Sequence, residues 1–172
     1  MRSLIIAIVG KSGSGKTELS KKIETFFGIS SLVSCTTRPK RPNEIDGVDH
    51  KFVTDADMPG RETMLAYTLY GGYHYWVTHD QLMPNVVYTY VINEDALVEM
   101  IDKFSFKYNF VTVYVDRTNI DVSEDRTLRD KDRTELDKIF YDYVIVNDGS
   151  FNDFTFKIGL CINTILNEIT NH

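Results

Sequence analysis

Short, continuous apolar runs recur along the chain and predict strands that are buried on both faces of a sheet. They are rich in β-branched residues, and they are separated by stretches with a different pattern. We expect such strands at residues 4–9, 31–35, 86–92, 110–115 and 141–148.

Helical spacing of apolar residues fills most of the intervals between these strands. The stretch TELSKKIETFF (17–27) has apolar residues three or four positions apart, and Gly28 after it is a natural helix end. Asn93 is expected to cap a second helix over 94–104, and a closing amphipathic helix is expected over 154–169. Strands that alternate with helices predict a mostly parallel sheet covered on both faces.

Two stretches break this alternation. Residues 36–80 are rich in Thr, Pro, Gly, Arg, Tyr and Asp, and the segments MLAYTLY (64–70) and YHYWVT (73–78) flank a Gly-Gly pair. That pattern predicts a small antiparallel hairpin. Residues 116–138 carry charges of both signs and almost no large apolar side chain, which taken alone is typical of a solvated helix or loop.

Composition narrows the class of protein. With 172 residues, of which 42% are hydrophobic and 26% charged, the chain suits one compact domain with an apolar core. The net charge of −6 argues against a binder of nucleic-acid polymers or of membrane surfaces, whose footprint is basic. A small anionic ligand stays compatible with this charge, because a local cluster of arginines can outweigh it.

The cysteines and the N-terminal segment point to an intracellular setting. Cys35 and Cys161 show no metal-ligand spacing and are expected to be reduced, mostly buried thiols. The apolar run that follows Met1 is too short for a signal peptide or a spanning helix and leads directly into a glycine-rich loop. We therefore expect a soluble, cytoplasmic protein.

That glycine-rich loop carries the first chemical signal. GKSGSGKT (10–17) fits G-x-x-x-x-G-K-[ST], and it stands between a predicted strand and a predicted helix. Such a loop turns its backbone N–H groups and the helix N-terminus toward the phosphates of a nucleoside triphosphate. The ATP-binding residues expected from it are Gly10, Ser12, Gly13, Ser14, Gly15, Lys16 and Thr17.

Within the loop, Lys16 is expected to reach the β- and γ-phosphates, and the Thr17 hydroxyl is expected to be a ligand of Mg²⁺ bound with ATP. The loop alone does not separate GTPases, motor ATPases and kinases. The strand at 86–92 has no Asp in its body, which disfavours a metal-binding switch of the hydrolytic enzymes.

The second chemical signal is SCTTRPKRPNEIDGVDHKF (34–52). It places Arg38 and Arg41 three residues apart among prolines and threonines. The arginine fork suits phosphate oxygens, and phosphoryl transfer needs such donors to neutralise the transferred group. Without the phosphate loop, the same stretch would read as a basic surface turn.

These blocks together resemble the guanylate kinase family of nucleoside monophosphate kinases. The family pattern S-x-T-T-R-x-x-R-x-x-E-x-[DN]-G-x-D-[YF]-x-F is matched nearly throughout by residues 34–52, and YDYVIVND (141–148) is similar to a late strand of the family. The resemblance implies a P-loop NTPase fold of three α/β/α layers, with a parallel core sheet, a small antiparallel insertion that binds the monophosphate, and a short lid. The implied parts are core at 1–34, 81–115 and 139–172, the monophosphate-binding subdomain at 35–80, and the lid at 116–138.

The resemblance also implies roles for single residues. Asn147 matches an asparagine near the adenine of ATP, and Arg126, Arg129 and Arg133 are the candidates for catalytic lid arginines beside Lys16, Arg38 and Arg41. His50 stands where an aromatic residue usually contacts the acceptor phosphate, and it can still donate a hydrogen bond. The acceptor-phosphate contacts implied are Ser34, Arg38, Arg41, His50 and Tyr75.

The chain departs from the family where the base is read. Ala66 stands where the family has a guanine-reading glutamate, Tyr90 and Ile92 occupy the region of a second acidic residue, and Thr78 is a counterpart of a base-contacting hydroxyl. Two interpretations stay open. Either Glu62 supplies the carboxylate, or another base is accepted in a more aromatic pocket made by Tyr67, Tyr73, His74 and Trp76.

The sequence thus predicts an ATP-dependent kinase of nucleoside or deoxynucleoside monophosphates, with GMP and dGMP as the first acceptors to consider. The expected partners are ATP, Mg²⁺ and a nucleoside monophosphate, and no nucleic-acid polymer or membrane is expected. The alternatives are a kinase of another small phosphate ester, such as a sugar phosphate, and a binding module that has lost catalysis.

Overall fold

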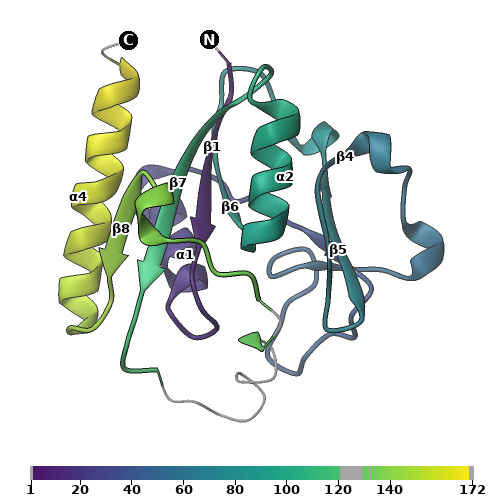
Figure 1. Ribbon diagram of the computed structural model, residues 1–172, viewed down its shortest axis with the longest axis horizontal. Helices are drawn as coiled ribbons and strands as arrows, with labels where there is room; N and C mark the ends of the chain where they lie inside the picture. Colours follow the sequence, from purple (N-terminus) through teal and green to yellow (C-terminus); the bar gives the residue numbers. More distant parts are fainter. Residues whose placement is uncertain (1, 121–129, 132, 171–172) are drawn as a thin grey trace.

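The computed structural model describes residues 2–120, 130–131 and 133–170. A four-stranded parallel sheet forms its centre (Figure 1). Its strand order is β6 (Val87–Val91), β1 (Leu4–Val9), β7 (Asn109–Asp116) and β8 (Tyr143–Val146). All three strand pairs are parallel, which confirms the predicted sheet.

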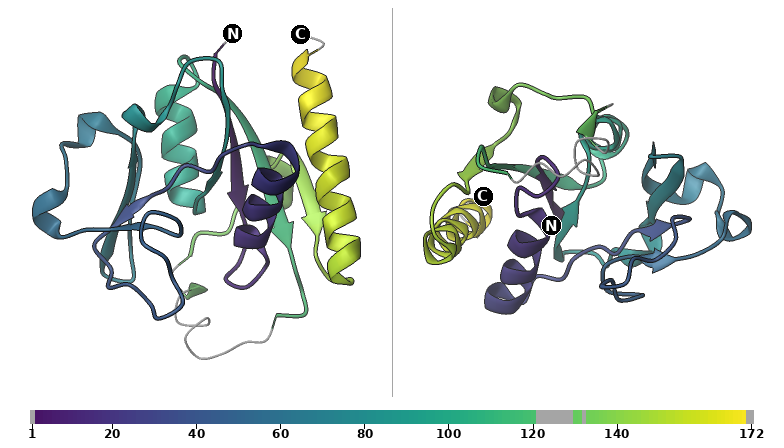
Figure 2. Two further views of the ribbon diagram at one scale, coloured as in Figure 1. Left: turned by 180° about the vertical axis from the view of Figure 1, so that it is seen from behind. Right: turned by 90° about the horizontal axis from the view of Figure 1, so that it is seen from below.

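Three long helices cover the two faces of this sheet. Side chains of β1 point alternately to opposite faces, so Ile6 and Ile8 pack in one apolar cluster while Ile5 and Ala7 pack in another. The first cluster contains residues of α1 (Lys16–Phe27) and α4 (Phe151–Thr170), and the second contains residues of α2 (Glu94–Phe104). Figure 2 shows α1 and α4 side by side, which confirms the three-layer arrangement.

Local signals explain where these helices begin and end. Gly28 caps α1 with φ of 67°, a left-handed conformation that glycine adopts without a Cβ clash. The side chain of Asn93 accepts a hydrogen bond from the backbone N–H of Ala96, which confirms the predicted cap of α2.

A second, smaller sheet packs beside the core. Its order is β3 (Lys51–Phe52), β2 (Cys35–Thr36), β5 (Tyr73–Thr78) and β4 (Met64–Tyr70). The antiparallel β4–β5 hairpin turns at Gly71 and Gly72, both with positive φ, as the alternating pattern predicted. Short 3₁₀ helices lie at Asp55–Asp57, Arg61–Thr63, His79–Gln81 and Lys138–Phe140.

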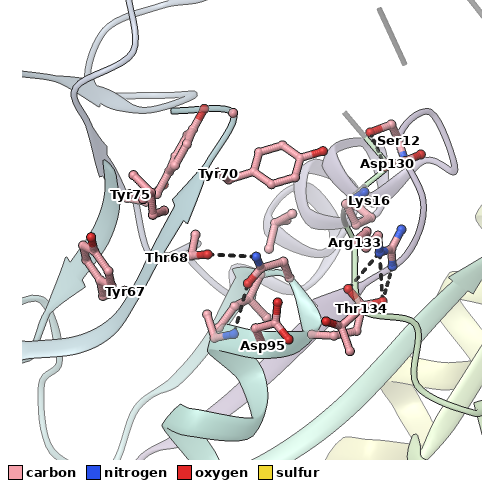
Figure 3. A pocket seen from close by; sticks show the side chains of 18 of the residues that line it. Ser12, Lys16, Tyr67, Thr68, Tyr70, Tyr75, Asp95, Asp130, Arg133 and Thr134 are labelled. Carbon is pink, nitrogen blue, oxygen red and sulfur yellow. Dashed lines mark hydrogen bonds and ion pairs between the residues drawn. The ribbon is translucent and has the colours of Figure 1, made fainter. Parts of the chain in front are cut away.

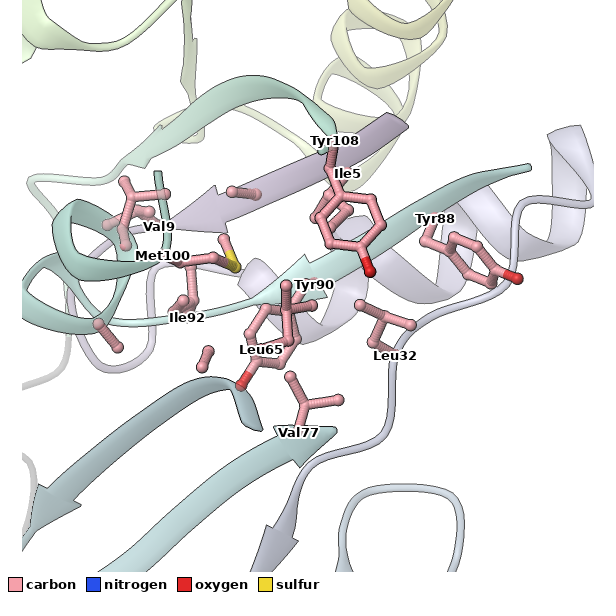
Figure 4. Packing of buried hydrophobic residues seen from close by; sticks show 14 of the residues in the cluster. Ile5, Val9, Leu32, Leu65, Val77, Tyr88, Tyr90, Ile92, Met100 and Tyr108 are labelled. Carbon is pink, nitrogen blue, oxygen red and sulfur yellow. The ribbon is translucent and has the colours of Figure 1, made fainter. Parts of the chain in front are cut away.

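The apolar core continues from the parallel sheet into this second sheet. Leu65 of β4 and Val77 of β5 belong to the same buried cluster as Tyr90 of β6 and Met100 of α2 (Figure 4). The two sheets therefore share one buried apolar cluster.

The strand predicted at 31–35 is only partly present. Ser31 makes a single parallel bridge with Thr89 of the core sheet, and the backbone N–H of Leu32 donates to the carbonyl of Thr89. The backbone N–H of Lys51 then donates to the carbonyl of Ser34, and β2 pairs with β3 and β5. The chain thus leaves the core sheet after Leu32, because from Ser34 onward its backbone groups bond to the second sheet.

In the predicted lid, Arg126 and Arg129 lie outside the described residues, whereas Arg133 is described. Among the helices that the structure describes, none has the length and hydropathy needed to cross a membrane.

Candidate active site

A cleft of about 560 Å³ runs between the phosphate loop and the second sheet (Figure 3). Lys16 lines it at the loop, and Ser34, His50 and Tyr75 line it at the second sheet. The start of α2 and residues 130, 133 and 134 complete its wall. The volume is in the range of small-molecule and cofactor sites.

The backbone of the phosphate loop admits only glycine at two closely packed points. A Cβ on Gly10 would lie 2.6 Å from the carbonyl oxygen of Val115, and one on Gly15 would lie 2.7 Å from the side-chain nitrogen of Asn147. Both glycines also have positive φ, of 154° and 111°. The loop is therefore packed closely against the ends of the core strands.

Side chains around the loop suit a bound triphosphate. The Ser14 hydroxyl is buried and has no hydrogen-bond partner among the described residues. The ammonium group of Lys16 donates to the carbonyl oxygens of Gly10 (2.6 Å) and Lys11 (2.9 Å), so it bends back over the loop. The Asn147 amide donates to the carbonyl of Ser14 (2.7 Å), which ties the end of β8 to the loop.

The donor set also suits magnesium bound with a nucleotide. In the described part of the chain, no group of three or more His, Cys, Asp or Glu side chains could hold a metal ion. Thr17 is exposed at the second position of α1, immediately after Lys16. A hydroxyl together with phosphate oxygens is a usual environment for Mg²⁺, which keeps few protein ligands.

A carboxylate lies on the phosphate loop. The backbone N–H of Ser12 donates to Asp130 at 3.0 Å, and the Ser12 hydroxyl donates to the same carboxylate at 2.9 Å. Lys11 pairs nearby with Glu135 at 2.8 Å. Asp130 thus accepts a hydrogen bond that the loop would otherwise offer to a phosphate oxygen.

Across the cleft, Ser34, His50 and Tyr75 form a polar group. Ser34 Oγ and His50 Nδ1 lie 2.8 Å apart, and the rings of His50 and Tyr75 meet edge to face with centroids 5.7 Å apart. Burial of His50, followed by the nearby charge of Arg38, lowers the pKa of its imidazole. His50 is therefore neutral at pH 7 and can offer one ring N–H.

Arg38 is held rigidly behind this group. Its side chain is 9% exposed; Nε donates to the Tyr75 hydroxyl at 3.1 Å, and one terminal nitrogen donates to Glu44 at 2.7 Å. Burial alone would lower the pKa of Arg38, but hydrogen bonds with Glu44 and Tyr75 outweigh it and raise the pKa. Arg38 does not line the cleft itself, and it reaches the lining through Tyr75.

Glu44 holds the second arginine as well. The backbone N–H of Arg41 donates to Glu44 at 2.8 Å, while the Arg41 side chain is 46% exposed and lies 3.7 Å from the same carboxylate. Sequence reasoning gave Glu44 no role, although its spacing of three and six residues from the arginines was a usable signal. The structure thus shows one arginine fixed and the other exposed, and neither lines the cleft.

Arg133 makes a buried ion pair at the other end of the wall. Its guanidinium binds the Glu94 carboxylate, with Nε at 2.8 and 3.0 Å from the two oxygens and a terminal nitrogen also in contact. The side chains are 7% and 1% exposed. Burial lowers the pKa of Arg133, but the hydrogen bond and charge of Glu94 outweigh it and raise the pKa. The pair fixes the start of α2 against the segment that carries Asp130.

Only some of the residues expected near the base line the cleft: Tyr67, Tyr90 and Ile92 do, whereas the candidates with a direct reading role do not. Ala66 is 5% exposed within the apolar core, and the Thr78 hydroxyl donates to Asp80 at the following 3₁₀ turn. Glu62 is exposed on a 3₁₀ turn and does not line the cleft, and Trp76 is buried at 2% exposure. Tyr90 does line the cleft, and burial raises the pKa of its phenol.

The polar groups found at this wall are Thr68 of β4 and Asn93 and Asp95 at the start of α2. The Asn93 amide donates to the Thr68 hydroxyl at 3.0 Å. From the sequence, Asn93 was identified only as a helix cap. Its position at the carboxyl end of a core strand was the available signal, because ligands of open α/β sheets bind there.

The comparisons with known proteins agree on one family. Residues 1–162 match the family model described as guanylate kinase. Similar curated proteins include the guanylate kinases of Nitrobacter hamburgensis, 50% identical over 56 residues, and of Thermotoga maritima, 43% identical over 58 residues. That of Nitrobacter winogradskyi is 44% identical over 78 residues.

These alignments are local. The match to the N. hamburgensis protein covers 32% of this chain and 26% of that relative. The match to the T. maritima protein covers 33% of this chain and 28% of that relative. The match to the N. winogradskyi protein covers 43% of this chain and 36% of that relative. Among solved structures, the guanylate kinase from Anaplasma phagocytophilum is similar with a TM-score of 0.70 and 20% identity, over 97% of this chain and 86% of that chain. At this identity the structural match supports the fold alone.

Proposed function

The chain belongs to the guanylate kinase family, and on this premise we propose that it is an ATP-dependent kinase of a nucleoside or deoxynucleoside monophosphate. The observation that carries the proposal is the single cleft that has Lys16 at one end and Ser34, His50 and Tyr75 at the other. GMP and dGMP are the first acceptors to assay, because the similar curated proteins are named guanylate kinases.

On the donor side, ATP binds residues 10–17 with its phosphates on the N–H groups of the loop. The ammonium of Lys16 turns from the carbonyl oxygens of Gly10 and Lys11, 2.6 and 2.9 Å away, to the β- and γ-phosphates. Thr17 would hold Mg²⁺ bound with ATP, and the ion would supply positive charge beside the phosphate oxygens. Asn147 orients the loop through Ser14, and its role near the adenine is carried over from the family resemblance.

On the acceptor side, residues 35–80 act as the monophosphate-binding subdomain. The Tyr75 hydroxyl donates to the acceptor phosphate, and one member of the Ser34–His50 pair donates beside it, since the other hydrogen of the pair lies between the two residues. Arg41 moves over the phosphate from its exposed position. Arg38 contributes positive charge from behind Tyr75, where Glu44 fixes it. An acceptor phosphate is already anionic at pH 7, so the reaction needs no general base.

Phosphoryl transfer then follows in line. An oxygen of the acceptor phosphate forms a bond to the γ-phosphorus, the bond from that phosphorus to the β–γ bridging oxygen breaks, and ADP leaves with the electron pair. Residues 116–138 act as a lid that excludes water and so limits hydrolysis. Arg133, together with Arg126 and Arg129, supplies the positive charge of the lid beside the transferred phosphoryl group. Glu94 positions Arg133.

The test is a coupled assay of ADP release with the full set of ribo- and deoxyribonucleoside monophosphates, with a sugar phosphate as a control. We expect ADP release that depends on at least one nucleoside monophosphate and is absent with the sugar phosphate. Binding of Mg·ATP without turnover of any monophosphate would contradict the proposal and favour a binding module. Turnover of the sugar phosphate alone would assign a different acceptor.

A further inference from the structure

His50 and Ser34 make one short contact on the acceptor side of the cleft. Nδ1 of His50 and Oγ of Ser34 lie 2.8 Å apart, and both residues line the cleft. Among the described residues, Nε2 of the same ring has no hydrogen-bond partner, and unlike the Ser14 hydroxyl it is not enclosed. The imidazole is therefore bonded at one nitrogen and open at the other.

The number of donors that this pair can offer depends on the charge of the imidazole. A neutral ring has one N–H, so the pair has two polar hydrogens, and one of them lies between Nδ1 and Oγ. One donor is left for a ligand, whichever tautomer is present. A protonated ring brings a second N–H, so that Nε2–H and the Ser34 hydroxyl are both free to donate. Protonation thus doubles the donors of the pair and adds a positive charge.

The ring is held in position by its neighbours. The rings of Phe52 on β3 and Tyr75 on β5 each meet the imidazole at a steep angle, with centroids 5.9 and 5.7 Å away. Together with the Ser34 contact, they fix the imidazole from three sides. His50 can therefore gain a proton without a change in the position of its ring.

The charged groups around His50 are mostly engaged with one another. Glu44 pairs with Arg38 at 2.7 Å, and Asp49 accepts from the backbone N–H of Ile45 at 2.8 Å. Burial, followed by the charge of Arg38, lowers the pKa of His50, although both carboxylates act in the opposite direction. The titratable and charged side chains nearest to the ring on the elements packed around it are Arg38, Glu44, Asp46, Asp49, Lys51 and Tyr75. The imidazole is thus neutral at pH 7 before the acceptor binds.

Resting on the proposed function, we propose that His50 binds the acceptor phosphate as an imidazolium and takes up the proton from solvent as the acceptor binds. The phosphate group of a monophosphate carries a charge of about −1.5 to −2 at pH 7. A negative charge within hydrogen-bond reach favours the protonated ring. Nε2–H and the Ser34 hydroxyl then both donate to phosphate oxygens, and the bond from the ring is charge-assisted.

The direction of the pH effect follows from this uptake. The complex holds one more proton than the free protein, so a lower pH favours the complex. The gain begins as the pH falls through the pKa of His50 in the complex. It levels off below the pKa of His50 in the free protein, which burial depresses. Between these two values, the acceptor affinity changes by up to about tenfold per pH unit.

Proton NMR of the histidine rings tests the uptake directly. The pKa of His50 is measured with and without a large excess of sulfate, a tetrahedral dianion that does not itself titrate between about pH 5 and 8. We expect sulfate to raise the pKa of His50 by at least about 1. His79 is the control in the same spectra, because it contacts Tyr108 and does not line the cleft. The resonance of His50 is assigned from its loss in His50→Tyr.

Kinetics test whether the proton contributes to acceptor binding. KM for the monophosphate that is turned over best is measured at saturating Mg·ATP, at about pH 6 and about pH 8, in wild type and in His50→Tyr. Tyrosine keeps an aromatic ring with one donor and stays neutral at both values. We expect the ratio of the variant KM to the wild-type KM to be about tenfold larger at the lower pH. The nucleotide's own protonation cancels in this ratio, and His79→Gln is expected to give the same ratio at both.

The outcomes separate the two proposals. A ratio that does not change with pH in folded His50→Tyr, as judged by thermal unfolding, overturns the inference and leaves the kinase intact. A pKa of His50 that sulfate does not raise also overturns it. Absence of turnover with every monophosphate contradicts the proposed function, and the sulfate titration then decides on the imidazolium alone.

Discussion

The phosphate loop and the other end of the same cleft differ in which atoms face the ligand. At the loop, glycines at 10 and 15 leave no room for a Cβ and hold the backbone whose N–H groups are the proposed phosphate contacts. At the other end, the polar groups that line the cleft include the side chains of Thr68, Asn93 and Asp95, which come from two elements. The first site is tied to one local sequence pattern, whereas the second can change with single substitutions.

This difference explains why one end of the cleft keeps a family pattern and the other does not. A backbone site needs glycine at set positions, and replacement there displaces the loop. A side-chain site needs only donors and acceptors at the right places. We therefore expect variants at the loop to remove catalysis, and variants at the acceptor end to change which substrate is used.

The largest expected effect is that of Lys16→Ala. Loss of the ammonium removes the positive charge at the β- and γ-phosphates, so kcat is expected to fall by at least about 1,000-fold. Steady-state ADP release measures it. Retention of a tenth or more of wild-type kcat in a folded protein would show that the loop does not act as proposed.

The next effect concerns the buried ion pair that Glu94, at the start of α2, makes with Arg133. Glu94→Ala leaves Arg133 as an uncompensated charge at 7% side-chain exposure, so the free energy of unfolding is expected to fall by about 3–5 kcal/mol. Urea unfolding measures the loss. A matched control is Glu99→Ala on the same helix, whose ion pairs are exposed and are expected to contribute less than about 1 kcal/mol. Equal losses would mean that the buried pair does not hold α2 in place.

A smaller effect is expected for Arg41→Ala. The KM for the acceptor should rise about tenfold, because one charge-assisted phosphate contact is lost, while the KM for ATP stays within about twofold. Arg2→Ala is the control, since Arg2 is also exposed and its side chain donates to the carbonyl oxygens of Ser105 and Phe106 away from the cleft. An equal rise in KM for both substrates would contradict the separation of donor and acceptor ends.

The smallest effect is expected for Asp130→Asn. The carboxylate competes with phosphate for the N–H of Ser12, so its neutralisation should tighten ATP binding a few-fold, by about 1 kcal/mol or less. Calorimetric titration with Mg·ATP in the absence of acceptor gives the affinity directly. Weaker ATP binding in this variant would mean that Asp130 supports the loop in its binding shape.

Sequence reasoning succeeded where the signal was local. The phosphate loop, the Asn93 cap and the Gly71-Gly72 hairpin each depend on a few adjacent residues, and all have the expected backbone form. The strand at 31–35 was overpredicted, because an apolar run does not show which sheet its backbone will join.

The rest of the site depends on contacts between distant residues. Thr68 and Asn93 are 25 positions apart, and Glu94 and Arg133 are 39 apart. Neither separation in sequence predicts a contact until the positions of β4, α2 and the segment after residue 130 are known. The pairing of Arg38 with Glu44 was closer in sequence, but the geometry that buries it comes from the second sheet.

The central claim is that one cleft carries a phosphoryl group from a triphosphate to a monophosphate. Phosphorus NMR of a reaction with Mg·ATP and each monophosphate in turn tests it most directly, because it identifies every product. The account predicts ADP and a nucleoside diphosphate in equal amounts, with little inorganic phosphate. ADP that accumulates with inorganic phosphate, at a rate independent of the monophosphate, would contradict it.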